Sequence, residues 1–136
     1  MPQLDAYLMF DGNCAEAMRF YERTLGGKLF LMTNADSPMA DKTPPGRGDK
    51  ILHARLDIDG RMLMGSDSPM EVGQKKGFSL SLVYATVPEA QKVFDALAGG
   101  GQVTMAFQKT FWAEGFGMLV DRFGTPWMVN GAMAPM

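Results

Sequence analysis

The segment NCAEAMRFYERTLGGKLFLM, residues 13–32, aligns without gaps on TVPEAQKVFDALAGGGQVTM, residues 86–105. The two copies lie 73 residues apart and share one order of features: a cap residue, an amphipathic stretch, glycines and a strand-like run. Internal similarity at a fixed offset indicates that a chain is built from copies of one structural unit. The remaining sequence therefore has to complete two such units.

Each copy begins with the sequence signature of a helix N-terminus. Asn13 with Glu16, and Thr86 with Glu89, have the spacing of a capping box. Apolar residues then follow at helical spacing, namely Ala17, Phe20, Tyr21 and Leu25 in one copy and Ala90, Val93, Phe94 and Leu97 in the other. Glycines end both patterns, where a left-handed C-cap needs no Cβ. We expect two amphipathic helices, each followed by a strand.

Strand-like runs surround each predicted helix. One run precedes each helix, at residues 4–10 and 78–85, and two more end each copy, at 51–58 with 61–66 and at 117–121 with 125–130. The order βαβββ, present twice, predicts an α+β protein. We expect one domain over residues 1–136, with module one at 4–66 and module two at 77–131. The two modules are expected to form a curved mixed sheet around a cleft.

A long loop distinguishes the first copy from the second. Near the ends of the copies the best match pairs Gly60 with Gly124 and Met64 with Met128, an offset of 64. The change from 73 to 64 indicates nine additional residues in the first copy, within residues 33–50. The Pro, Gly and Asp content of that segment is typical of a loop. It is either a lid over the cleft or a surface insertion without a role.

Strand alternation separates two faces of the run at residues 51–58. The apolar set that suits packing beneath a helix is Leu52, Ala54, Leu56 and Ile58. The alternate set, on the opposite face, is Ile51, His53, Arg55 and Asp57. We expect His53 and Arg55 to face the cleft, which is the default ligand site of such a fold.

Composition narrows the function classes. With 46% hydrophobic residues, 21% charged residues and a net charge of -2, the 136-residue chain can bury a core but offers no basic surface to nucleic acid. No apolar stretch approaches the roughly 20 residues that span a bilayer, and the N-terminus lacks the layout of a signal peptide. The one cysteine, Cys14, excludes an internal disulfide. We expect a cytoplasmic protein in which Cys14 is a small structural residue.

Three long segments, in the same order, resemble PhnB-like proteins. They are YLMFDGNCAEAMRFYERTLGG at residues 7–27, KILHARLDIDGRMLMGSD at 50–67 and TFWAEGFGMLVDRFGTPWMVN at 110–130. This family, sometimes described as 3-demethylubiquinone methyltransferase-like, is a branch of the vicinal oxygen chelate (glyoxalase/bleomycin resistance) superfamily. The resemblance implies paired βαβββ modules and a homodimer. It implies no single reaction, because the fold hosts isomerases, dioxygenases, thiol transferases and binding proteins.

The metal enzymes of that superfamily place ligands on the first and last strands of each module, usually His or Gln and then Glu. The resemblance, carried along the chain by the two offsets, maps these positions to Ala6, Met64, Ser79 and Met128. None of the four offers an anionic or imidazole donor to a hard or borderline divalent ion. Two methionines could bind Cu(I), but apolar packing is their commoner role. We expect no metal at these positions and no cofactor.

His53, the one histidine in the sequence, is the catalytic candidate. A carboxylate such as Asp57 on the same face would fix its tautomer, as in a general base, although these residues also suit a solvated strand face. The ligand-binding candidates are Arg55, Met64, Trp112, Phe116 and Met128. The aromatic residues form either a wall for an apolar ligand or part of a core or dimer interface. Asp67 and Asp121 are most simply turn-forming residues.

Three functions fit these observations. The first is a metal-free homodimer that binds a small organic molecule in the cleft, with the reaction left open. The second is a metal-dependent enzyme of the glyoxalase or dioxygenase type, with a displaced ion on His53 and carboxylates. The third, a methyltransferase, ranks last because no glycine-rich strand-to-helix turn for adenosylmethionine is present. Metal content of the purified protein separates the first two.

Overall fold

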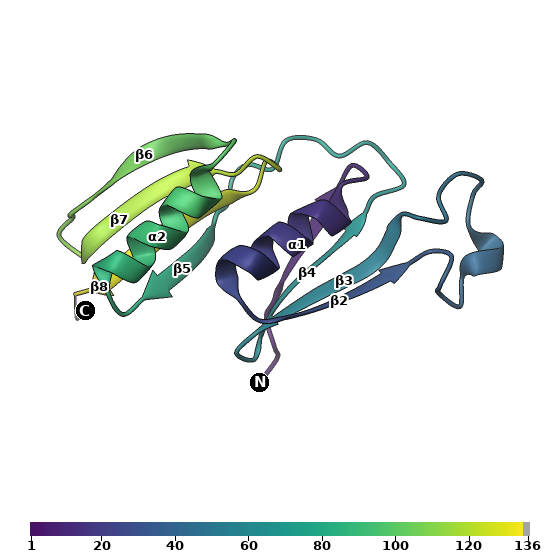
Figure 1. The fold of residues 1–136 in the computed structure, drawn as a ribbon, viewed down its shortest axis with the longest axis horizontal. Coiled ribbons are helices and arrows are strands. Elements are labelled where there is room, and N and C mark those ends of the chain that lie inside the picture. The colour runs from purple at the N-terminus through teal and green to yellow at the C-terminus, as the bar shows by residue number, and fades with distance from the viewer. Residues whose placement is uncertain (135–136) are drawn as a thin grey trace. The chain divides into compact units, whose positions relative to one another are not determined.

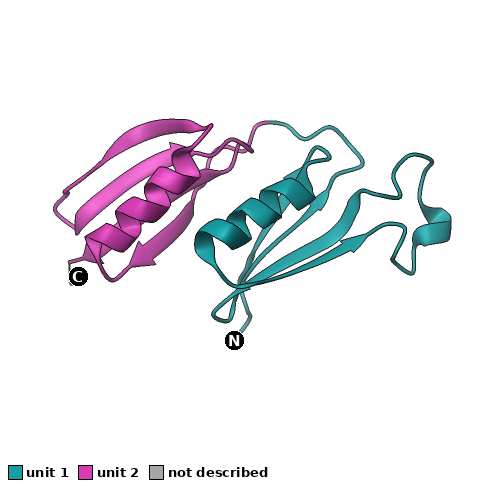
Figure 2. Ribbon diagram, in the orientation of Figure 1, with its two compact units in different colours: residues 1–73 teal, residues 74–136 magenta. Residues whose placement is uncertain are grey.

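The computed structural model describes residues 1–134 (Figure 1). The chain divides into two compact units, residues 1–73 and 74–136 (Figure 2). Each unit contains one four-stranded mixed sheet and one α-helix of 12 residues. The predicted α+β fold with two βαβββ modules is therefore confirmed. Within residues 1–134, no helix is long and apolar enough to cross a membrane.

Unit 1 has one face of its sheet covered by a helix. Its elements are β1 (Ala6–Phe10), α1 (Cys14–Leu25), β2 (Lys28–Thr33), the 3-10 helix η1 (Ala40–Lys42), β3 (Ile51–Ile58) and β4 (Arg61–Asp67). The strand order is β1-β4-β3-β2, with β1 and β4 parallel and the other neighbours antiparallel. Helix α1 buries Ala17, Met18 and Tyr21 on its sheet side. The opposite face of the sheet carries no helix of this unit (Figure 1).

Unit 2 repeats this arrangement. Its elements are β5 (Leu80–Tyr84), α2 (Val87–Ala98), β6 (Gln102–Gln108), β7 (Ala113–Val120) and β8 (Pro126–Met133), with strand order β5-β8-β7-β6. Glycines beneath α2 allow its close approach. A Cβ at Gly131 would lie 2.8 Å from the Cβ of Ala90, and one at Gly117 would lie 2.6 Å from the ring of Phe94. Both positions therefore require a residue without a side chain.

The gapless repeat holds for the helices but not for the strands. Helices α1 and α2 begin 73 residues apart, whereas β1 and β5, like β2 and β6, begin 74 residues apart. The connection before α1 is one residue longer than the one before α2, and the connection after α2 has one additional glycine. These two differences cancel across each helix, so the helices align while both flanking strands are displaced by one residue.

A bulge at the start of β3 changes the predicted alternation. The pairing with β2 skips Leu52, which leaves that residue outside the regular ladder. Ile51 is consequently 3% exposed and Leu52 37% exposed. The prediction that Leu52 packs beneath the helix and that Ile51 faces away is wrong, whereas for Ala54 and Leu56, both fully buried, it is confirmed.

Only the second helix forms the predicted side-chain cap, and its Glu89 carboxylate accepts the cap hydroxyl and not the cap N–H of a full capping box. Thr86 Oγ1 accepts a hydrogen bond from the Glu89 N–H at 3.3 Å and donates one to Glu89 Oε1 at 2.8 Å. Asn13 makes no side-chain cap bond. The first N–H of α1, that of Cys14, is instead donated to Asp67 Oδ1 at 2.9 Å.

This difference predicts unequal costs for equivalent substitutions. Thr86→Ala is expected to lower the free energy of unfolding by about 1 kcal/mol because it removes a formed cap. Asn13→Ala is expected to cost less than about 0.5 kcal/mol because no side-chain cap bond is lost. Urea unfolding of both variants measures the two values, and equal losses would contradict the assignment.

Candidate functional site

The sheet face opposite α1 carries the main sequence candidates of unit 1. We call it the His53 face and define it by two rows of side chains, each crossing the strands in the order β1, β4, β3, β2. The rows are Tyr7, Met64, Arg55 and Phe30, and, two positions along each strand, Met9, Ser66, His53 and Met32. The structure therefore brings together three predicted site residues, His53, Arg55 and Met64.

Two ring contacts organise the His53 face. The His53 imidazole stacks on the Tyr7 ring with centroids 5.9 Å apart and an interplanar angle of 30°. The Arg55 guanidinium carbon lies 5.3 Å from the centroid of the Phe30 ring, within cation–π range. Tyr7 is 46% exposed and Phe30 43% exposed, so both rings remain accessible. Sequence reasoning missed these two residues, although alternation along β1 and β2 could have placed them.

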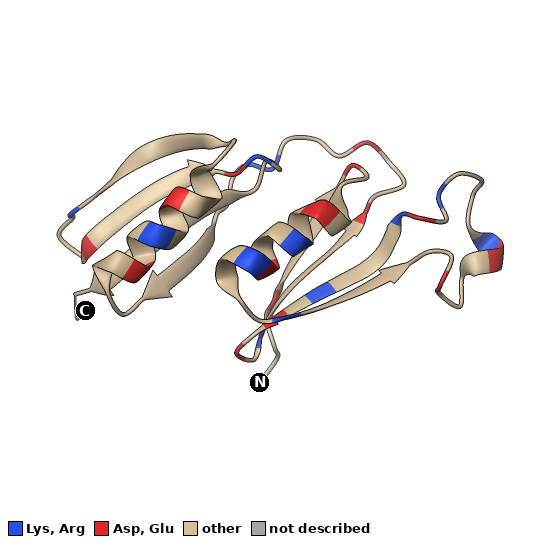
Figure 3. Cartoon of the chain, viewed as in Figure 1, with Lys and Arg blue, Asp and Glu red and all other residues tan. Residues whose placement is uncertain are grey.

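The predicted contact between His53 and the Asp57 carboxylate is not formed. Asp57 Oδ1 accepts the Gly60 N–H at 2.9 Å and so belongs to the β3–β4 turn. Across residues 1–134, neither His53 nor Arg55 has a carboxylate within ion-pair distance. Charged residues lie mainly on helices and loops and rarely on strands (Figure 3). The arrangement thus offers an unpaired cation and an imidazole on a largely apolar surface, without the orienting carboxylate of a general base.

The predicted site residues of unit 2 also lie together. Met128 pairs with Met118, and Phe116 pairs with Asn130, on the face of that sheet opposite α2. The Trp112 ring contacts the Phe116 ring edge-on at 5.1 Å. Because Phe116 is only 5% exposed, Trp112 and Met128 supply the accessible part of this group.

The strand pairing groups other residues with Met64 and Met128 than the sequence predicted. Tyr7, not Ala6, lies opposite Met64, and Ser81, not Ser79, lies opposite Met128. Ala6 lies opposite Leu63. Neither the pair Tyr7 and Met64 nor the pair Ser81 and Met128 offers the carboxylate or imidazole that a divalent ion prefers. These pairs, like the predicted residues, do not fit the metal that the resemblance implies.

The alternative metal site, an ion displaced to His53 and nearby carboxylates, also lacks a set of ligands. Within residues 1–134, no group of three or more His, Cys, Asp or Glu side chains is placed to hold a metal ion. The carboxylates of Asp57 and Asp67 are both occupied by backbone N–H groups. No observation therefore favours an ion on His53.

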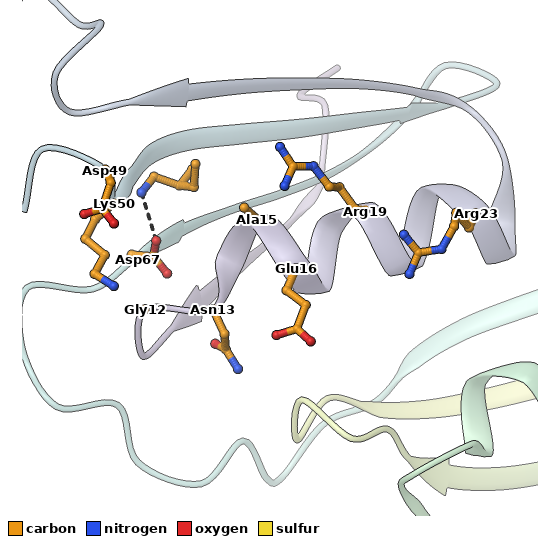
Figure 4. Close-up of a pocket in the computed structure, with 10 residues that line it drawn as sticks. Gly12, Asn13, Ala15, Glu16, Arg19, Arg23, Asp49, Lys50 and Asp67 are labelled. Carbon is orange, nitrogen blue, oxygen red and sulfur yellow. Dashed lines mark hydrogen bonds between the residues drawn. The ribbon is translucent and has the colours of Figure 1, made fainter.

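A separate pocket of about 430 Å³ lies at the N-terminus of α1 (Figure 4). Its charged lining consists of three cations and three carboxylates, namely Arg19, Arg23, Lys50, Glu16, Asp49 and Asp67. Figure 4 shows Glu16 and Arg19 pointing to different sides of the helix. The buried carboxylate of Asp67 already accepts the N–H groups of Cys14 at 2.9 Å and Ile51 at 2.8 Å. This lining selects no ligand charge, and its buried carboxylate has a structural role.

Two residues that the sequence predicts to be structural, Cys14 and Asp121, have surroundings that fit this role. Cys14 is fully buried, and burial, with a smaller effect of the Asp67 carboxylate, raises the pKa of its thiol to about 12. Asp121 accepts the N–H groups of Phe123 and Thr125 at 2.9 and 3.0 Å and the Trp127 indole N–H at 2.8 Å. The first is too poor a thiolate source for nucleophilic catalysis. The second forms its turn and also fixes Trp127 in the core.

Comparison with known proteins gives extensive matches. The sequence profile of the family described as 3-demethylubiquinone-9 3-methyltransferase matches residues 2–130. Protein YjdN of Escherichia coli is 40% identical over 137 residues, covering 93% of each chain. The crystal structure of protein PA1353 from Pseudomonas aeruginosa is 45% identical, with a TM-score of 0.88 over 96% of this chain and 98% of that one.

Two further solved structures extend the likeness. A putative 3-demethylubiquinone-9 3-methyltransferase, PhnB protein, from Bacillus cereus is 26% identical, with a TM-score of 0.80 over 96% of this chain and 100% of that one. A glyoxalase/bleomycin resistance protein/dioxygenase family enzyme from Burkholderia phytofirmans shares the fold, with a TM-score of 0.62 at 16% identity over 95% and 99% of the chains. The chain therefore belongs to the 3-demethylubiquinone-9 3-methyltransferase (PhnB-like) family.

Proposed function

We propose that the protein binds a small organic molecule on the His53 face, without the divalent ion of its superfamily. The observation that carries this proposal is the pair Arg55 and His53, which lie unpaired by carboxylates between two half-exposed aromatic rings. Exposed apolar surface around a few polar groups is typical of ligand sites. The thioethers of Met32 and Met64 add a pliable lining.

Unit 2 has an apolar surface of its own. Trp112 and Met128, supported by Phe116, are proposed as ligand-binding residues of that unit. None of these three residues is charged. This surface therefore supplies contact area and not orientation.

The methyltransferase named in the family description would need a site for adenosylmethionine, and this chain does not fit one. That cofactor is usually held at a glycine-rich turn between a strand and a helix of a parallel, doubly wound sheet. Each sheet of this chain has one parallel pair, and the turn before α1 has a single glycine, Gly12. The residues present do not fit such a site, so methyl transfer is not proposed.

The proposal is tested by a fragment screen with ligand-observed NMR. Fragments of mixed charge are expected to bind the wild-type protein, and His53→Ala is expected to weaken the hits by about tenfold or more while leaving the melting temperature unchanged. Asp49→Ala, in the pocket at α1, serves as the matched control and should not weaken them. Equal binding by wild type and His53→Ala, or losses confined to Asp49→Ala, would overturn the proposal.

We further propose that the protein is a homodimer. Each sheet has two unpaired edges, and β6 is an edge strand with six of its seven residues exposed and no charge or proline to protect it. Pairing with a second copy would cover such surfaces. Light scattering at micromolar concentration is expected to give twice the 14.9 kDa mass of one chain. A mass of one chain would contradict this.

A further inference from the structure

We infer that the ligand of the His53 face is a flat organic anion, an aromatic or conjugated carboxylate held by Arg55. This inference rests on the proposed function and specifies the substrate class of the same site. It depends on three properties of that face: its charge, the state of its one guanidinium and the orientation of its rings.

The two rows of the face carry one permanent charge. Among their eight residues, Arg55 is the one permanently charged residue, and none is an acid. One row further along the same face, Asp57 lies opposite Lys28 of β2 and accepts the Gly60 N–H in the hairpin turn. Arg55 is therefore the group of these two rows that can attract an anion.

The Arg55 guanidinium is oriented but not neutralised. Phe30 lies 5.3 Å from its central carbon, which places the ring in contact with the cation and limits its freedom. No carboxylate pairs with it anywhere in residues 1–134. Its N–H donors are thus available to a planar oxyanion, for which the guanidinium fork is suited in a way that a lysine ammonium is not.

The rings favour a flat ligand. The His53 and Tyr7 planes lie at 30° to one another, so the imidazole and phenol form a stacked pair on the face that also carries Arg55. Met64 lies between Tyr7 and Arg55 in the same row. A conjugated ring can contact such a surface over its whole area, while a branched aliphatic acid of equal charge cannot.

The competing explanation is that Arg55 is a solvated surface residue. Solvated arginines on a sheet face give no preference between an acid and its neutral amide. The two explanations are separated by three probes that share one ring system: 2-naphthoate, its neutral amide 2-naphthamide and the cation 2-naphthylmethylammonium. Dissociation constants are measured by ligand-observed NMR.

Four proteins are compared: wild type, Arg55→Gln, Arg55→Lys and Arg23→Gln. The last variant removes the same charge from helix α1, away from the His53 face, and serves as the matched control. Wild type is expected to bind 2-naphthoate at least about tenfold more tightly than 2-naphthamide. Arg55→Gln should reduce this preference to within about a factor of two, Arg55→Lys should keep part of it, and Arg23→Gln should keep all of it.

The possible failures are distinguishable. If 2-naphthamide binds as tightly as 2-naphthoate, or if the preference survives Arg55→Gln or disappears equally in Arg23→Gln, the inference is wrong. Neutral fragments that lose affinity in His53→Ala would then still support the proposed function. If none of the three probes binds, the inference is also wrong, and an empty fragment screen would remove the proposed function with it.

Discussion

Replacing Gly27 by alanine is expected to lower the free energy of unfolding by about 3 kcal/mol. Gly27 joins α1 to β2 with a φ of 96°, which L side chains rarely adopt. A Cβ there would also overlap the backbone carbonyl oxygen of Asp57 on β3. Because that oxygen belongs to the sheet ladder, the clash cannot be relieved by rotating a side chain. The whole α1–β2 junction would have to move.

The neighbouring residue supplies the control. Gly26 also has a positive φ, 81°, but nothing lies within 4 Å of the place its Cβ would take. Gly26→Ala should therefore cost only the strain of its backbone conformation, φ 81° with ψ −165°, which is about 2 kcal/mol. Urea unfolding of the two variants measures the difference. Equal costs would show that the close approach to β3 does not contribute.

Replacing Asp67 by alanine is expected to cost about 3 kcal/mol of unfolding free energy. Its buried carboxylate accepts the N–H groups of Cys14 and Ile51, residues 53 and 16 positions away in the sequence. It thereby ties the start of α1 and the start of β3 to the end of β4. Removal leaves two buried donors without partners, and each such donor is costly.

An exposed carboxylate of the same pocket serves as the comparison. Asp49→Ala, also in the lining shown in Figure 4, is expected to change the free energy of unfolding by less than about 0.5 kcal/mol. Thermal or urea unfolding at neutral pH gives both values. A small loss for Asp67→Ala would mean that Asp67 is free to act on a ligand in that pocket.

The helices could be predicted closely because their signals are local. The cap spacing and the glycines bound both segments, and α1 and α2 begin and end within a residue of the expectation. What failed was the cap of α1. Asn13 has the right spacing but makes no side-chain cap bond, and the first N–H of α1 is donated to Asp67, far away in the sequence. A contact of this kind depends on tertiary structure.

The strands show why a gapless repeat misplaces residues. One additional residue before α1 and one additional glycine after α2 cancel over the helix, so the alignment looks perfect where it is strongest. The equivalent of Ala6 was therefore expected at Ser79, whereas the equivalent position of β5 is Leu80. The prediction that Leu52 is buried beneath the helix failed for a related reason. A bulge shifts the two-residue period of the strand by one position, and the composition of the segment does not reveal it.

The sequence predicted the sheet face on which the candidate site lies, but not the aromatic residues that accompany His53 and Arg55. Alternation along β3 placed His53 and Arg55 on the face away from α1, because Ala54 and Leu56 must be buried. The rings that accompany them belong to β1 and β2, at the two edges of the sheet. Their identity as partners depends on strand order, which a single sequence does not contain. The predicted Asp57 contact failed because the hairpin turn uses that carboxylate.

Methionine methyl NMR tests the central claim, ligand binding on the His53 face, most directly. In protein carrying 13C-methyl methionine, 2-naphthoate and 2-naphthamide are titrated in parallel, with each signal assigned by Met→Leu substitution. We expect at least one probe to shift the signals of Met9, Met32 and Met64, while those of Met39 and Met70, exposed elsewhere in unit 1, remain in place. Shifts confined to Met39 or Met70, or none with either probe at millimolar concentration, would contradict it.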